Sequence, residues 1–286
     1  MDKKDLFGLI LSIIAIISHS VGFSILWITK QKSLYKESQR FFLLHQSFVA
    51  NLHSFLLVLM IIFKWMHRDD LTNYVFIISA VGTFPMLVFI LISMTFDRFL
   101  TIFYGLDYVL IWNKKRSKIL ILFEYLIVLG GVSVSLLLIT TFERAYFITL
   151  RYIWLPIHAV FGVFTISIQS YMLSKVFLQH DLVGGTVRHH EHIKKALLTV
   201  TLSTFTFILF ISIPDIISFV YDANERMPPP ELTFALYICY RFGLVLTAFI
   251  YVYDCSEVRI YIQKTIRRIT QRGEKRESNE MEQMSK

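Results

Sequence analysis

The chain has 286 residues, of which 55% are hydrophobic and only 17% are charged, and 26 of them are phenylalanine. An ordinary soluble domain is about one quarter charged, and a disordered chain carries far fewer apolar residues, so both classes are excluded. The two cysteines are too few for a disulfide-stapled secreted fold. The composition therefore predicts a polytopic membrane protein.

Seven runs with almost no Asp, Glu, Lys or Arg divide the chain, and each has at least 22 residues. About 20 apolar residues let a helix cross the hydrocarbon core of a bilayer, and a helix satisfies its own backbone hydrogen bonds in lipid. We therefore expect an all-α membrane protein with a seven-transmembrane helix bundle, in which the first run is a span and not a cleavable signal peptide. The runs cover residues 6–29, 41–63, 71–96, 119–142, 152–174, 196–220 and 232–253.

Lysine and arginine are divided unevenly between the connectors of these helices. The connectors on the side of the C-terminus contain 21 of them, and the connectors on the side of the N-terminus contain 7. Because cytoplasmic loops are enriched in Lys and Arg, we expect a multi-pass protein with its C-terminus in the cytoplasm and its N-terminus outside. The net charge of +8 is then a signal of topology, not of nucleic-acid binding.

The pattern changes after the last span. Between residues 255 and 271, apolar residues recur at helical spacing with basic residues among them, which is typical of an amphipathic helix on an anionic inner leaflet. Residues 272–286 are polar without periodicity and predict a disordered cytoplasmic tail. The chain is thus divided into a bundle over 1–254, a membrane-surface helix over 255–271 and the tail.

The end of the third span carries Asp97, Arg98 and Phe99, and Leu106 and Tyr108 follow in the next connector. This stretch resembles the Asp-Arg-Tyr motif of the rhodopsin-like (class A) G-protein-coupled receptors and the Pro-Leu-x-Tyr-like stretch that follows it. The resemblance implies that the arginine engages a G protein when the bundle opens. An adjacent aspartate can hold the arginine by charge until such a partner competes. The alternative is an ordinary interfacial charge pair at the end of a span.

The seventh span provides a second match. Its Thr-Ala-Phe-Ile-Tyr segment, which ends at Tyr251, resembles the Asn-Pro-x-x-Tyr motif of the same family. The resemblance places Tyr251 in the coupling region, although Tyr is also a common interfacial anchor. Pro156 and Pro214 stand where the family has prolines in the fifth and sixth spans. Since a proline removes a backbone hydrogen bond and kinks its helix, we expect both to be pivots.

Three charged residues lie inside the expected spans, namely Glu124, Asp215 and Arg241. Charge inside a bilayer is costly and by default indicates function. At 1.5 Å per residue, Asp215 and Arg241 differ in depth by only about 5 Å. The family register turns both toward an outer cavity together with Ala80, so they are interpreted either as ligand contacts or as a structural bridge between two spans. Glu124 is interpreted as a hydrogen-bonded structural residue.

The resemblance implies a receptor of the plasma membrane that converts the binding of a small molecule, lipid or short peptide into activation of a heterotrimeric G protein. The partial motifs and the aromatic spans suit a receptor of the orphan or chemosensory type. The alternatives are a seven-helix transporter or channel with Asp215 and Arg241 along its path, or a receptor-like scaffold that has lost coupling. We expect no cofactor and no enzymatic activity, because no catalytic motif is present. A metal site at His189, His190 and His192 is not expected either, since such clusters in loops are usually solvated.

Overall fold

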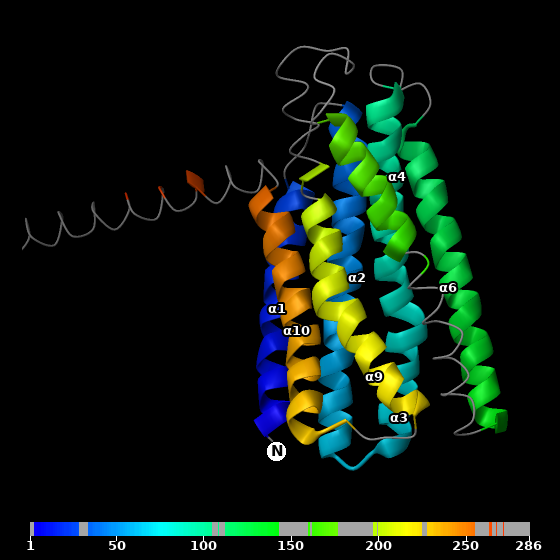
Figure 1. Ribbon diagram of the computed structural model, residues 1–286. Coiled ribbons are helices and arrows are strands. Elements are labelled where there is room, and N and C mark those ends of the chain that lie inside the picture. The colour runs from blue at the N-terminus through cyan, green and yellow to red at the C-terminus, as the bar shows by residue number, and fades with distance from the viewer. Residues whose placement is uncertain are drawn as a thin grey trace, which may run out of the picture.

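The computed structural model describes the parts of the chain that carry most of the apolar runs. They are residues 3–28, 34–104, 108, 112–142, 160, 162–176, 197–198, 200–224, 228–254, 263–264, 267 and 271. Every regular element within these residues is a helix, and no strand occurs among them. The long helices lie side by side in an elongated bundle (Figure 1). The prediction of an all-helical architecture is confirmed.

The helices follow the apolar runs, because each run is long enough to satisfy its backbone within one helix. Two of the runs contain a π-helical turn between two α-helical parts. The elements are α1 (Lys3–Ile28), α2 (Leu34–Trp65), α3 (Asp69–Ile77), η1 (Ile78–Thr83), α4 (Phe84–Tyr104), α6 (Lys114–Phe142), η3 (Ile208–Ser212), α9 (Ile213–Ala223) and α10 (Pro230–Asp254). Residues 162–176 and 200–207 are helical as well.

Among the described residues, six helices are long and apolar enough to cross a membrane, judged by length and composition. They are Lys4–Ile28, Phe41–Trp65, Asp69–Tyr104, Lys115–Leu137, Val200–Ser218 and Pro230–Ile250. These six coincide with six of the seven predicted runs, which supports a multi-pass membrane protein. Of the remaining run, residues 162–174 are helical, and nearly all of its first half lies outside the described residues. Most of the predicted surface helix and the whole tail lie outside them too, so these two elements and the seventh span stay predictions.

The third span is the central helix of the bundle and the fourth is peripheral. The most apolar window of Asp69–Tyr104 is 67% buried, whereas that of Lys115–Leu137 is only 22% buried. On α4 the buried residues point to all sides, and on α6 they form a narrow stripe that includes Ile121, Glu124 and Val128. A helix that is apolar on every side but buried on one must face lipid with the rest.

Two π-helical turns lie directly before prolines. η1 ends two residues before Pro85, and η3 ends two residues before Pro214. Since proline has no N–H to donate to the carbonyl four residues back, the preceding turn widens. The Ile213 N–H donates to the Ile208 carbonyl, five residues back, and the corresponding bond follows η1. The extra residue changes which side chains face the core after each turn.

Pro214 was expected from the sequence to distort its helix, and it lies two residues after the end of η3. Pro85 lies at the same place after η1, and the sequence interpretation overlooked it although it interrupts the charge-free run 71–96. Pro156 lies outside the described residues.

Candidate functional site

Asp97 and Arg98 are buried near the end of α4, with exposed fractions of only 1% and 7%. The Nη2 atom of Arg98 lies 3.4 Å from Oδ2 of Asp97. The Nε atom of Arg98 has no hydrogen-bond partner within the described part of the chain. Arg98 is therefore a buried cation that Asp97 pairs with and that retains one unused donor.

Tyr108 lies close to Asp97 from the segment that follows α4. Its side chain is buried, and its hydroxyl donates a hydrogen bond to Oδ1 of Asp97. The carboxylate of Asp97 thus accepts from Tyr108 at one oxygen and faces Arg98 at the other. The sequence analysis placed Tyr108 in a family-like stretch, but it did not foresee this bond.

Apolar side chains pack together beside Arg98. We call this end of the bundle the Arg98 end. Phe99 is half-buried, and its ring centroid lies 4.3 Å from that of Phe103. Phe99 packs against a cluster contributed by α4, the helix at 162–176 and residue 197; its buried members are Ile102, Met172, Val176 and Leu197. Phe99, the third residue of the Asp97-Arg98-Phe99 motif, therefore joins α4 to the helix at 162–176 and to Leu197.

Arg241 is the second buried cation, only 3% exposed, in the middle of α10. Its Nη1 donates to the hydroxyl of Ser12 on α1, and its Nη2 lies 3.2 Å from the hydroxyl of Tyr237, to which it donates. The guanidinium carbon also lies 4.9 Å from the centroid of the Tyr237 ring. Its Nε has no hydrogen-bond partner within the described residues. Arg241 therefore extends toward α1, which the sequence analysis did not anticipate.

For the remaining predicted ligand and coupling residues, the structure gives mainly the helix in which each one lies. Ala80 is half-buried within η1, Asp215 lies in α9 and Tyr251 lies in α10. The side chains of Asp215 and Tyr251 lie outside the described residues. The pairing of Asp215 with Arg241 and the coupling role of Tyr251 stay predictions.

His53 forms a buried polar cluster that the sequence analysis missed. Its Nδ1 lies 2.7 Å from Oγ1 of Thr83 and 3.3 Å from Oγ of Ser79, both in η1. Its Nε2 lies 2.5 Å from the hydroxyl of Tyr240 on α10, next to Arg241 in the chain. One side chain of α2 thus joins η1 to α10. The available signal was a histidine in the middle of a run with no charged residue.

The opposite end of the bundle carries an exposed ion pair. Nζ of Lys64 lies 3.1 Å from Oδ2 of Asp5, and the Lys64 side chain is 61% exposed. Lys4 approaches the same place, with its Nζ 5.0 Å from the centroid of the Tyr237 ring. Exposed pairs contribute about 0–1 kcal/mol, so this group orients the ends of α1 and α2 more than it stabilises them.

Glu124 is buried on α6 and accepts a hydrogen bond from the hydroxyl of Ser93 on α4. The expectation that Glu124 is hydrogen-bonded is confirmed at Oε1, whereas its Oε2 has no partner within the described residues. Farther along α4, Thr95 accepts from Nε2 of Gln169 at 3.0 Å, and the same amide donates to Thr204 at 2.7 Å. These bonds join α4 to α6, to the helix at 162–176 and to the helix at 200–207.

Within the described residues, no group of three or more His, Cys, Asp or Glu side chains is close enough to hold a metal ion. The histidine cluster at 189–192 lies outside them. No protein-family model matches this chain, and no curated protein matches it. The chemistry of the candidate site therefore rests on the contacts of its own residues.

Proposed function

We propose that this protein is a rhodopsin-like G-protein-coupled receptor of the plasma membrane. A small molecule, lipid or short peptide binds at the extracellular end of the bundle, and a heterotrimeric G protein binds at the Arg98 end. Asp215, Arg241 and Ala80 are the proposed ligand contacts. Asp97, Arg98, Phe99 and Tyr251 are the proposed coupling residues, and Pro156 and Pro214 are the proposed pivots.

The observation that carries the proposal is the buried Asp97–Arg98 pair with its second partner, Tyr108. A charged side chain near the end of a span would normally extend into the polar interface. Arg98 is instead held inside, with a spare donor and a neighbouring carboxylate. A cation restrained in this way can be released to a protein partner when the helices separate, because the partner supplies competing acceptors.

Polar contacts in the middle of the bundle can communicate a ligand's presence to that pair. Arg241 and the His53 cluster join α1, α2 and α10 to η1, which continues directly into α4. A ligand that binds one arrangement of these helices better than another shifts the population between the two. The shift reaches Asp97 through α4, a single rigid element.

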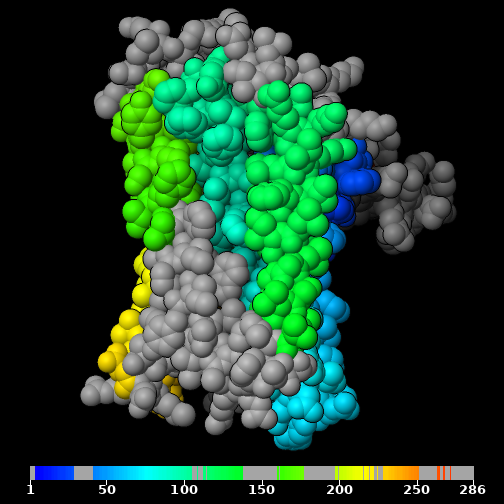
Figure 2. Space-filling model, turned by 90° about the vertical axis from the view of Figure 1, so that its right-hand side faces the viewer, coloured from blue at the N-terminus to red at the C-terminus, as the bar shows by residue number. Residues whose placement is uncertain are grey.

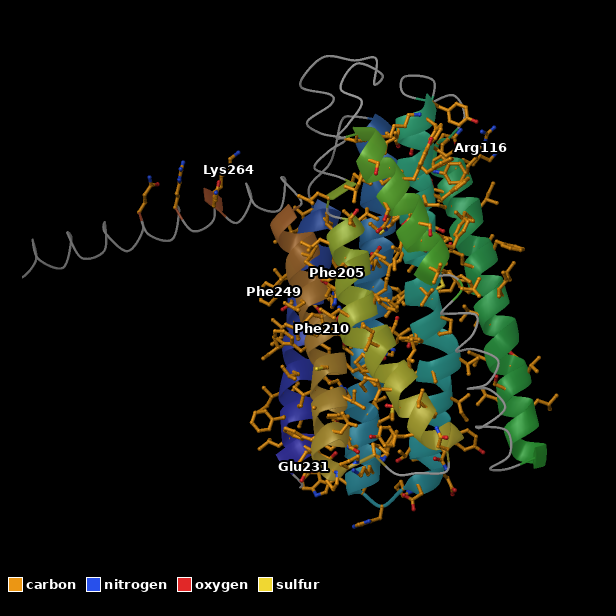
Figure 3. All side chains as sticks on the ribbon, in the orientation of Figure 1. Arg116, Phe205, Phe210, Glu231, Phe249 and Lys264 are labelled. Carbon is orange, nitrogen blue, oxygen red and sulfur yellow. The ribbon has the colours of Figure 1, made fainter. Side chains whose placement is uncertain are left out.

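The proposal is tested by nucleotide exchange on purified G proteins with the receptor in lipid vesicles. We expect the wild-type protein to accelerate nucleotide exchange, either constitutively or with ligand. In Arg98→Gln the accelerated exchange rate should fall by at least about tenfold. Arg116→Gln is the matched control, because Arg116 is exposed and lies at the same end of the molecule (Figure 3). Exchange that does not depend on Arg98 would contradict the proposal.

A transporter or channel is the second candidate, favoured by the buried polar contacts around Arg241 and His53. Buried ionisable groups within spans often mark an ion or substrate path. In proteoliposomes, this alternative predicts solute flux that Arg241→Met reduces and Arg98→Gln leaves unchanged. A scaffold that has lost coupling predicts neither flux nor exchange.

A further inference from the structure

A cavity of about 140 Å³ lies between α4, α6 and the helix at 162–176. Its apolar walls come from all three helices; they are Ile92 and Phe96 of α4, Leu120 of α6, and Phe164 and Ile168. The cavity is distinct from the proposed ligand contacts, since none of Ala80, Asp215 and Arg241 lines it.

The cavity faces the lipid side of the molecule. Part of α4 is visible between α6 and residues 162–176 in the view of that face (Figure 2). The two aromatic side chains at the cavity, Phe96 and Phe164, are 42% and 55% exposed. Since the surrounding helices are predicted spans, a molecule dissolved in the bilayer reaches the cavity without crossing water.

Two of the three hydroxyl groups in the cavity wall, those of Ser93 and Thr95, already have partners within the protein. The Ser93 hydroxyl donates a hydrogen bond to the Glu124 carboxyl group. Thr95 donates to the Leu91 carbonyl at 2.8 Å and accepts from Gln169 at 3.0 Å. A ligand that needed hydrogen bonds would have to break these buried ones, and breaking them leaves polar groups unpaired at a cost. The cavity therefore selects an uncharged, apolar molecule.

The volume sets the size of that molecule. An apolar cavity of about 150 Å³ in a protein core stays dry and accepts benzene or xenon. The present cavity has a similar volume, about 140 Å³, with two phenylalanine walls, and it differs in being open on one side; its volume suits one six-membered ring. Aromatic rings also pair favourably with an aromatic ligand in edge-to-face or offset geometry.

The cavity is adjacent to the contacts that fix the Arg98 end. Thr95 lies two residues before Asp97, about 3 Å along the helix axis. Its partner Gln169 also binds Thr204, so three helices meet at one side chain beside the cavity. A molecule that fills the cavity stabilises the arrangement in which these helices are packed and Arg98 is buried.

We propose that this cavity is a membrane-facing ligand site for one uncharged, ring-sized apolar molecule. Its occupancy favours the arrangement with Arg98 buried and so lowers G-protein activation; this second part rests on the proposed receptor function.

Binding is tested with fluorobenzene and the purified full chain in lipid nanodiscs, followed by ¹⁹F NMR against empty nanodiscs. We expect a saturable component that weakens at least tenfold in Ile168→Phe and in Leu120→Phe, which fill the cavity from two different helices. The matched controls are Ile166→Phe and Leu122→Phe, whose parent side chains are 44% and 59% exposed outside the cavity; both should bind as the wild type does.

Fluorobenzene uptake that does not saturate is simple partitioning into the bilayer, and it would overturn the proposed site. Equal uptake by the cavity-filling variants and their controls would overturn it too. Phenol serves as the polar comparison. If phenol binds at least tenfold more tightly than fluorobenzene, the apolar ligand class is wrong.

The regulatory part is tested by adding fluorobenzene to the exchange assay. We expect Arg98-dependent exchange to fall in the wild type and to be unaffected in Ile168→Phe. A rise, or no change at a saturating concentration, overturns the regulatory role. Saturable binding to a protein that shows no Arg98-dependent exchange under any condition would leave the binding site standing and refute the proposed receptor function.

Discussion

At the scale of single residues, Asp97 is the acceptor on which the Arg98 end depends. Its two carboxylate oxygens face different groups, Arg98 on the same helix and Tyr108 from the following segment. Both contacts are buried, so neither is weakened by water as an exposed ion pair is. Removing one donor should therefore loosen the pair without deleting it.

Replacing Tyr108 by Phe removes the hydroxyl donor and leaves the ring in place. A hydrogen bond to a charged group contributes about 1.5–3 kcal/mol, so we expect basal nucleotide exchange to rise by about tenfold or more. Tyr104→Phe is the control, because Tyr104 is 47% exposed and should change exchange by less than about twofold. If Tyr108→Phe lowers exchange instead, Tyr108 is a coupling residue and does not restrain Arg98.

Ser12 has the corresponding role for Arg241. It accepts from the guanidinium and donates to the Gly8 carbonyl at 2.8 Å. Ser12→Ala leaves a buried charged donor without its acceptor, so we expect the free energy of unfolding to fall by about 1.5–3 kcal/mol. Unfolding in mixed micelles measures the change. Ser24→Ala, at an exposed position of the same helix, should stay within about 0.5 kcal/mol; equal effects of the two changes would show that Ser12 does not stabilise Arg241.

At the scale of elements, α10 packs closely against η3 because residue 243 is glycine. A Cβ atom at Gly243 would lie 2.7 Å from Cβ of Phe210 and 3.1 Å from Cγ1 of Ile211. The Cβ of Phe210 is bonded directly to the backbone, so it cannot rotate away. A larger residue at position 243 must therefore push the two helices apart. Close approach at a small residue is common between membrane helices.

We therefore expect Gly243→Ala to lower the free energy of unfolding by about 1–3 kcal/mol, the usual cost of overpacking. Gly130→Ala is the matched change in α6, where a Cβ would meet nothing within 4 Å. There the gain in helix propensity should stabilise the protein by up to about 1 kcal/mol. Thermal unfolding of both variants separates the two effects, and a stabilising Gly243→Ala would mean that α10 and η3 separate without cost.

At the scale of the whole molecule, the number of spans decides on which side each connector lies. Seven spans place residues 143–151 outside the cell and residues 175–195 in the cytoplasm, whereas six spans without the run 152–174 place both on one side. The positive-inside bias favours the first arrangement. The same arrangement puts the predicted surface helix on the inner leaflet.

Cysteine labelling distinguishes the two arrangements in a chain with Cys239→Ser and Cys255→Ser, which removes both native thiols. We expect a membrane-impermeant maleimide to modify Thr149→Cys in intact cells and Thr186→Cys only after permeabilisation. The parent chain with Cys239→Ser and Cys255→Ser and no added cysteine is the control, and it should stay unlabelled. Labelling of both positions from the same side would contradict the seven-span bundle.

The position and length of the helices were readable from the sequence, because insertion into a bilayer depends on local properties. A stretch of about 20 apolar residues crosses the membrane whatever the rest of the chain does. All six candidate spans accordingly fall within or close to predicted runs. The burial and hydrogen bonding of Glu124 were foreseen for the same reason, since a charged group in lipid must find a partner.

The partners of the buried polar groups depend on packing between distant parts of the chain. Arg241 binds Ser12 across 229 positions, and His53 meets Tyr240 across 187. Which neighbour a polar side chain meets depends on how each helix is rotated about its axis. The π-turns before Pro85 and Pro214 alter that rotation partway along two spans. Composition and spacing thus define a helical membrane protein, whereas its buried polar clusters, its tyrosine-bound Asp97 and the cavity between α4, α6 and residues 162–176 arise only when the helices are packed together.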